Sequence, residues 1–182
     1  MIYMPEIAEW NDAVEYKPFL KSARENVELM KARYVDLMVS KEETEALSGI
    51  QNRVDILVFG TDRCNDTAGN LPVLARIASL SPNVGLRILD SDKNGHFHEA
   101  LKVNGKKKTP VVLFLSSDHH ELLRWIERPT AAYKIMNELN DSSLEERSVE
   151  LKKLYSDPEI LRQSLSEFMS LLRRADYVLG RH

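Results

Sequence analysis

The spacing of apolar residues changes along the chain and predicts two kinds of segment. Within residues 19–39, apolar side chains recur every three or four positions, which places them on one face of an α-helix. A second short helix is expected at 41–47, ending where Gly49 suits a left-handed C-terminal cap. Residues 54–59 instead form a short, almost wholly apolar run, which is typical of a strand covered on both faces.

The rest of the middle section alternates strand-like runs with helical patterns. Three more strands are expected, at 84–89, 111–115 and 121–126. The pattern also predicts a helix at 64–80, a short helix or irregular turn at 94–103, and a helix at 130–139. Pro72 lies inside the first of these helices and is expected to kink it. This order of elements is typical of an α/β protein built around a central sheet.

The last section of the chain is predicted to be helical again. Ser143 followed by Glu146 has the pattern of a capping box, in which the two side chains hold the first turn of a helix. Asp157 followed by Pro158 offers a second helix start, with proline at the first helical position. An apolar stripe then predicts a final helix that packs on the sheet: Ile160, Leu161, Leu165, Phe168, Leu171, Leu172 and Ala175.

Composition and charge exclude several classes of protein. The 182 residues are 43% hydrophobic and 29% charged, which is ordinary for a globular domain and excludes disorder. The net charge of −3 gives no strong positive field, so no nucleic-acid partner is expected. Apolar stretches such as 111–115 are too short to span a membrane. A single cysteine and the absence of a signal-peptide pattern predict a cytoplasmic location.

Histidine and aspartate spacing does not predict a metal site. His96 and His98 are two residues apart, a spacing that does not fit a pair of zinc ligands on one helix face. Asp90, Asp92 and Asn94 alternate like the opening of a calcium loop, but the acidic ligand that should close such a loop is missing. Turn formation explains these residues better, and we expect no metal.

Cys64 is the strongest candidate for chemistry. It stands at the predicted start of the helix at 64–80, where free backbone amides and the helix dipole stabilise a thiolate over a thiol. Arg63 adds a positive charge beside it, whereas Asp62 and Asp66 act in the opposite direction. Because its neighbours in sequence are polar, we expect a partly exposed thiol rather than a buried core cysteine.

The order of these segments resembles that of thioredoxin-like proteins. The strand at 56–59 is followed by Cys64-Asn65-Asp66-Thr67 in place of a C-x-x-C motif, and Pro72 lies where the family has a helix-kinking proline. After the next strand, at 86–90, Thr109-Pro110 matches the loop that contains a cis-proline in the family. The chain looks most like uncharacterised bacterial thioredoxin-family proteins with helical extensions.

The resemblance implies a three-layer α/β/α fold with a central mixed sheet of four or five strands and extra helices at both ends. We therefore expect an N-terminal helical extension at 1–50, a thioredoxin-like core at 51–140 and C-terminal helices at 141–182 packed on that core, all forming one compact unit. Cis geometry at Thr109-Pro110 is also an implication of the resemblance, because X–Pro bonds in general are mostly trans.

The departures from the family pattern limit the chemistry that the resemblance implies. Thr67 replaces the second cysteine, so an intramolecular dithiol–disulfide cycle is impossible. Arg63 stands where the family usually has tryptophan, and Val58 where many members bury an aspartate. What remains is a monothiol oxidoreductase, with Cys64 as the catalytic nucleophile and an outside thiol, such as glutathione, as the resolving group. No other cofactor is implied.

The remaining site residues follow from the same resemblance. Thr67 is expected to donate a hydrogen bond to the sulfur, and Arg63, Thr109 and Pro110 to contact the substrate, a protein or small-molecule disulfide or thiol. The alternative is a non-catalytic interaction module that keeps the peptide-binding groove and has lost redox activity. Residues 106–108, all lysine, form either a positive rim for acidic partners or a solvated turn. The sequence leaves both choices open and does not specify an oligomeric state.

Overall fold

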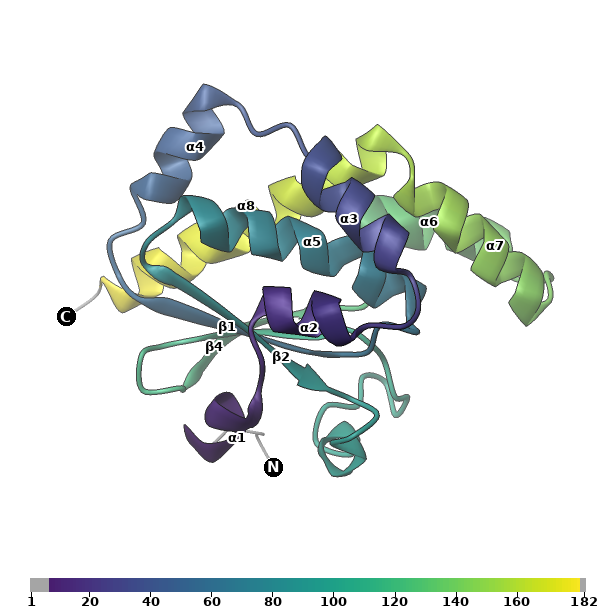
Figure 1. Cartoon of the computed structure of the whole chain (residues 1–182), viewed down its shortest axis with the longest axis horizontal. Helices are drawn as coiled ribbons and strands as arrows, with labels where there is room; N and C mark the ends of the chain where they lie inside the picture. Colours follow the sequence, from purple (N-terminus) through teal and green to yellow (C-terminus); the bar gives the residue numbers. More distant parts are fainter. Residues whose placement is uncertain (1–6, 181–182) are drawn as a thin grey trace.

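The computed structural model describes residues 7–180 and builds them around a mixed four-stranded sheet (Figure 1). The strands are β1 (Val54–Gly60), β2 (Val84–Asp90), β3 (Val111–Leu115) and β4 (Glu121–Ile126), arranged in the order β2-β1-β3-β4. β1 pairs in parallel with β2 and antiparallel with β3, which pairs antiparallel with β4. The expected α/β class and mixed sheet are confirmed. Residues 1–6 and 181–182, on which the signal-peptide prediction and the ends of the predicted extensions fall, lie outside the described residues.

The helices are arranged before, between and after the strands. They are α1 (Ile7–Asp12), α2 (Tyr16–Ser22), α3 (Val27–Asp36), α4 (Lys41–Ser48), α5 (Asn65–Leu80), α6 (Thr130–Glu138), α7 (Leu144–Tyr155) and α8 (Pro158–Leu179). One turn of 3-10 helix, η1 (Gly95–His98), lies in the connection between β2 and β3, where the sequence predicted a short helix or irregular turn.

Alternate residues of β1 face two separate apolar layers. Ile56 and Val58 pack in a core formed with α5 and α8, while Leu57 and Phe59 pack on the other face with Trp10 of α1. Because side chains of a strand point alternately to its two faces, a strand covered on both sides is apolar at nearly every position, as the sequence indicated. The expected three-layer arrangement is therefore confirmed, with α1 and the β2–β3 connection forming the thinner layer (Figure 1).

The single helix predicted at 19–39 is wrong, because the chain forms two helices, α2 and α3, with a break between them. At the break, the backbone amides of Arg24 and Glu25 donate to the carboxylate of Asp62, with N–O distances of 2.6 and 3.1 Å. Asn26 adopts a left-handed conformation, with φ of 54°, and its side-chain amide donates to the Asp62 carbonyl. These contacts with a distant loop replace intrahelical bonds and outweigh the local helical pattern.

The helix ends follow the sequence closely, with one exception. Ser143 and Glu146 form the predicted reciprocal capping box at the start of α7, and the Asp157 carboxylate accepts the amide of Glu159 at the start of α8. Gly49 does end α4, but with φ of −83°, so the left-handed cap predicted there is wrong. Its amide donates to the Glu45 carbonyl as in an ordinary helical turn.

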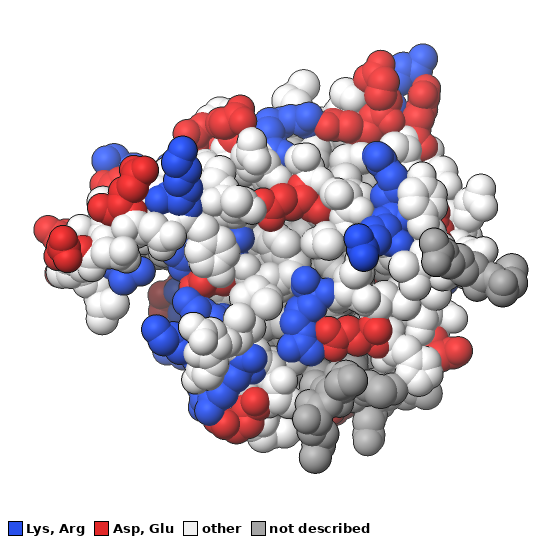
Figure 2. Space-filling model, turned by 180° about the vertical axis from the view of Figure 1, so that it is seen from behind, with Lys and Arg blue, Asp and Glu red and all other residues white. Residues whose placement is uncertain are grey.

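Both helical extensions pack against α5, the helix that begins after Cys64. α3 lies along α5 from the N-terminal side of the chain, and α8 packs against both α5 and the sheet. The boundaries predicted at residues 50 and 140 stay predictions. Figure 2 shows Lys and Arg interspersed with Asp and Glu on the face seen from behind. Within residues 7–180, no helix has the length and apolar character needed to cross a lipid bilayer.

Candidate functional site

The chain turns sharply after β1 and delivers Cys64 to the start of α5. Cys64 is the N-cap residue, with an extended backbone (φ −84°, ψ 120°), and its carbonyl accepts the first helical bond from the Ala68 amide at 2.9 Å. Its side chain does not accept a capping hydrogen bond and is partly exposed. The expected position of the thiol at a helix start is therefore confirmed.

The proline loop lies directly opposite the cysteine. The Cys64 thiol donates to the carbonyl of Thr109, with an Sγ–O distance of 3.4 Å, although the two residues are 45 positions apart. The Thr109-Pro110 bond is cis, as the resemblance implied, and Pro110 leads directly into β3. The structure thus brings together Cys64, Thr109 and Pro110, three of the residues singled out from the sequence.

Gly60, the last residue of β1, allows the helix start and the proline loop to meet. A Cβ added there would lie 2.7 Å from Oγ1 and 2.9 Å from Cγ2 of Thr67, and 3.4 Å from Cβ of Pro110. No side chain fits between these groups without moving one of them. Glycine at this position lets the first turn of α5 pack closely on the end of the strand.

Thr67 is buried below the cysteine rather than paired with it. Its side chain is fully buried, and among the described residues its hydroxyl has no hydrogen-bond partner. The predicted hydrogen bond to the Cys64 sulfur is thus not formed in this structure, and a donor role for Thr67 stays a prediction.

The unpaired hydroxyl leads to a test by isosteric replacement. Thr67→Val is expected to raise the free energy of unfolding by about 1 kcal/mol, because it removes a buried hydroxyl without a partner and keeps the side-chain shape. Chemical denaturation measures the effect. Thr61→Val is the matched control and is expected to destabilise the protein, since the Thr61 hydroxyl donates to Asp92 at 2.9 Å. A loss of stability in Thr67→Val would show that its hydroxyl is satisfied in solution.

Arg63 is held by an ion pair on the rim of the site. Its guanidinium contacts both carboxylate oxygens of Asp92, with N–O distances of 3.0 and 2.8 Å, and most of its side chain is exposed. The hydrogen bond that Arg63 donates to Asp92 lowers the pKa of Asp92 and raises the pKa of Arg63. Arg63 therefore remains on the exposed edge beside Cys64, and its contact with a substrate stays a prediction.

Asp62, on the other side of Arg63, ties this loop to the N-terminal helices. Burial acts to raise the pKa of Asp62, but hydrogen bonds from the amides of Arg24 and Glu25 outweigh it and leave the pKa below its ordinary value. A charged carboxylate on backbone amides makes strong hydrogen bonds. The loop that presents Cys64 is consequently fixed by residues far earlier in the chain.

The three lysines before the proline loop have different surroundings. Lys106 pairs through its backbone with Val103 across a tight turn in which Asn104 and Gly105 are left-handed, so the expected turn is confirmed. Lys107 lies 3.6 Å from Glu99. Lys108 instead contacts the buried Glu127, with Nζ–O distances of 3.0 Å, so it is not simply part of a solvated turn.

Sequence reasoning missed a buried polar cluster beside the site. Asp66, taken from the sequence only as a charged neighbour of the cysteine, is 4% exposed and accepts hydrogen bonds from Arg128 at 2.8 Å and from the Tyr155 hydroxyl at 2.5 Å. Burial raises the pKa of Asp66 to about 6, against the opposing effects of Arg128 and Tyr155. No local signal could have shown this, because Tyr155 lies 89 residues later.

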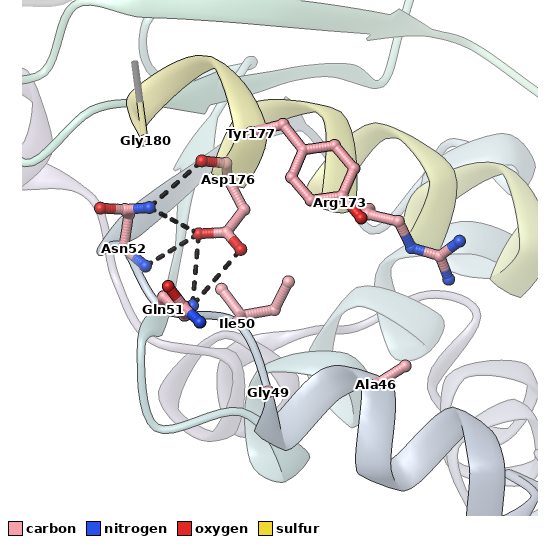
Figure 3. Close-up of a pocket in the computed structure, with 9 residues that line it drawn as sticks. All are labelled: Ala46, Gly49, Ile50, Gln51, Asn52, Arg173, Asp176, Tyr177 and Gly180. Atoms are coloured by element: carbon pink, nitrogen blue, oxygen red, sulfur yellow. Dashed lines mark hydrogen bonds between the residues drawn. The ribbon is translucent and has the colours of Figure 1, made fainter. Parts of the chain in front are cut away.

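A pocket of about 550 Å³ lies at the opposite end of β1 (Figure 3). It is bordered by the end of α4, the segment before β1 and the end of α8. Its main acidic group, Asp176, already accepts hydrogen bonds from the backbone amides of Gln51 and Asn52 and from the Asn52 side chain. This carboxylate connects α8 to the start of β1 and is not free to hold a ligand. Elsewhere in residues 7–180, no three His, Cys, Asp or Glu side chains are grouped to hold a metal ion.

Comparison with known proteins defines the class to which this fold and site belong. The thioredoxin family model matches residues 7–143, and the chain is a member of the thioredoxin family. The match includes the N-terminal helices α1 to α4, which the sequence resemblance had not covered.

Two solved structures show the same fold along nearly the whole chain. A protein of unknown function from Pseudomonas aeruginosa, PA1234, is 21% identical with a TM-score of 0.74, over 94% of this chain and 99% of that one. An HIV epitope scaffold is also 21% identical, with a TM-score of 0.70, over 93% of this chain and 98% of that one. No curated protein matches the sequence.

Proposed function

We propose that this thioredoxin-family protein carries out monothiol thiol–disulfide exchange through Cys64. The observation that carries the proposal is the position of the thiol: partly exposed, at the N-terminus of a 16-residue helix, with Sγ 3.4 Å from the carbonyl of Thr109. Helix N-termini stabilise thiolates, which are the reactive form of cysteine. An outside sulfur atom can approach the exposed side of Cys64.

The proposed reaction has two exchange steps. The Cys64 thiolate attacks one sulfur of a substrate disulfide, forms a mixed disulfide with it and releases the other sulfur as a thiolate. A second thiolate, from a molecule such as glutathione, then attacks the substrate sulfur of the mixed disulfide. This step makes a new disulfide between the substrate and the outside thiol and returns Cys64 as a thiolate. No net oxidation or reduction of the protein occurs, and no second cysteine is needed.

Thr109 and Pro110 are proposed to hold the substrate during the attack. The Thr109 carbonyl accepts the S–H of Cys64, and this hydrogen bond is lost when the thiol loses its proton. The carbonyl is then free to accept a backbone amide from an extended peptide, as in the addition of a strand. Loss of the thiol proton would therefore free the Thr109 carbonyl, which is the acceptor that the substrate amide needs. Arg63, exposed beside the cysteine, is proposed to contact acidic groups of the substrate.

Mixed-disulfide formation gives a direct test. The native protein, incubated with glutathione disulfide, is expected to gain one glutathionyl group by mass spectrometry, and Cys64→Ser is expected to gain none. At pH 6, iodoacetamide is expected to label native Cys64 at least about tenfold faster than the same cysteine in the unfolded chain, because the unfolded chain has no helix start to stabilise the thiolate.

The competing function, a non-catalytic interaction module, predicts the opposite results. Native Cys64 that labels no faster than the unfolded chain, and forms no mixed disulfide, would favour the module and end the proposal. Non-covalent binding of a peptide by Cys64→Ser, together with the absence of disulfide exchange by the native protein, would also favour the interaction module. We propose a cytoplasmic location, where the thiols required for the second step are maintained in reduced form.

A further inference from the structure

A single arginine joins two buried carboxylates next to the candidate site. One terminal nitrogen of Arg128 lies 2.8 Å from a carboxylate oxygen of Asp66 and 2.8 Å from one of Glu127. All three residues are more than nine-tenths buried. Burying a charged side chain is costly unless it is paired, so this arrangement depends on the cation at its centre.

The two carboxylates belong to the two halves of the site. Asp66 lies in the first turn of α5, two residues after Cys64. Glu127 lies just beyond β4, and its backbone amide donates to the carbonyl of Pro110 at 2.8 Å. Its carboxylate also binds Lys108, the residue before Thr109. Arg128 is therefore the link between the helix that carries the cysteine and the loop that faces it.

Glu127 has a backbone conformation that requires such support. Its φ is +65°, in the left-handed region that residues other than glycine seldom occupy. A residue in this conformation persists only when its surroundings hold it there. Here the side chain is held by Arg128, Lys108 and the hydroxyl of Tyr133, which donates to it at 2.7 Å.

The remaining neighbours complete the charge balance of the cluster. On the α5 side, Tyr155 of α7 donates to Asp66, and Asn70 donates to the Tyr155 hydroxyl at 3.0 Å. Two carboxylates thus face two cations, Arg128 and Lys108, with tyrosine hydroxyls on either side. Removing Arg128 would leave a carboxylate two residues from Cys64 without its cation.

We propose that Arg128 is a positioning residue, which joins Asp66 at the start of α5 to Glu127 beside the proline loop and so holds that loop against Cys64. This role for Arg128 rests on the proposed function, thiol–disulfide exchange through Cys64. Arg128 does not touch the substrate in this scheme. Its effect on Cys64 passes through Asp66 on one side and through Glu127 and Pro110 on the other.

The test compares substitutions that remove the bridge, the charge or both. Arg128→Met is expected to slow exchange of Cys64 with glutathione disulfide about tenfold, because the loop that faces the thiol is no longer joined to the helix. In the same variant, amide hydrogen exchange of Glu127, whose N–H donates to the Pro110 carbonyl, is expected to become at least about tenfold faster. Arg128→Lys keeps the cation but loses the guanidinium that bridges the two carboxylates and lies over the Tyr133 ring, and is expected to recover only part of the loss. Arg124→Met, which removes an arginine paired with Glu121 on β4, is the matched control and should change neither quantity.

A charge-neutral variant separates positioning from electrostatics and covers the case in which Arg128→Met does not fold. In Asp66→Asn/Arg128→Met the position of Asp66 carries no charge and Glu127 keeps its ion pair with Lys108, so no buried carboxylate is left without a cation. Exchange with glutathione disulfide should nevertheless stay about tenfold slow, because the loop is no longer joined to the helix. Circular dichroism and thermal unfolding establish that each variant is folded at the temperature of the assay.

Two results would overturn the proposal. One is a folded Arg128→Met in which the rates of exchange with glutathione disulfide and of Glu127 amide hydrogen exchange lie within about twofold of those of the Arg124→Met control. The other is a charge-neutral variant that exchanges with glutathione disulfide as fast as the wild type. Amide hydrogen exchange needs no disulfide exchange. If the wild type forms no mixed disulfide, the proposed function fails, while the hydrogen-exchange rate of the Glu127 amide still decides whether Arg128 holds the loop.

Discussion

Gly69→Ala is expected to lower the free energy of unfolding by about 3 kcal/mol, the upper part of the range for overpacking a core. A Cβ on Gly69, in the middle of α5, would lie far inside contact distance of the Tyr155 ring. The ring cannot easily move aside, because Tyr155 is fully buried and its hydroxyl is bonded to Asp66 and Asn70. The guanidinium of Arg33 also lies over the ring and donates to the Gly69 carbonyl. Chemical denaturation measures the loss.

Two further variants separate this clash from a general effect of alanine. Gly95→Ala introduces the same methyl group at a position with no atom within 4 Å, and is expected to change stability by less than about 0.5 kcal/mol. In a Tyr155→Ala background, Gly69→Ala should be nearly neutral, because the ring is gone. An equal cost of Gly69→Ala in both backgrounds would show that Tyr155 is not the obstacle.

The second large effect is a pH dependence that arises from Asp66. Burial raises the pKa of Asp66 from 3.8 to about 6, although Arg128 and Tyr155 act to lower it. Between these two values the folded protein keeps a proton that the unfolded chain releases, so stability falls as the pH rises through this range. A difference of about two units corresponds to about 3 kcal/mol, present below pH 4 and lost above pH 6. The free energy of unfolding, measured from pH 3 to 8, gives the profile.

Comparison with Asp66→Asn isolates this contribution from those of other groups. Since asparagine does not titrate, the wild type should lose stability relative to Asp66→Asn as the pH rises from 4 to 6. Asp62→Asn is the control of opposite sign, because the pKa of Asp62 is lowered and its contribution is lost only as the pH falls below its ordinary value. Parallel profiles of the wild type and Asp66→Asn would show that Asp66 has an ordinary pKa in the fold.

Much of the fold could be predicted because its determinants are local in sequence. The run at 54–59 contains enough apolar residues to specify a strand with both faces covered, and Ser143 and Asp157 specify helix starts through contacts two or three residues away. The position of Cys64 opposite Thr109 was also predictable, but only from the order of segments that the thioredoxin resemblance supplied.

What the sequence could not predict depends on contacts between distant segments. The helical pattern at 19–39 is real, yet the amides of Arg24 and Glu25 bind Asp62, and this tertiary contact ends one helix and starts another. Asp66, Arg128 and Tyr155 are separated by tens of residues, and each looks like an ordinary polar or aromatic residue in its own segment.

The hydrogen bonds of Asp62 have a consequence for anyone who wishes to transfer this site to another scaffold. The two residues whose amides hold the Asp62 carboxylate lie 38 and 37 positions before it, in the break between α2 and α3. Grafting only β1, the Cys64 loop and α5 would carry over the reactive sulfur without the backbone that shapes its loop. A faithful transplant must therefore include the turn at 24–26, or supply two amide donors in its place.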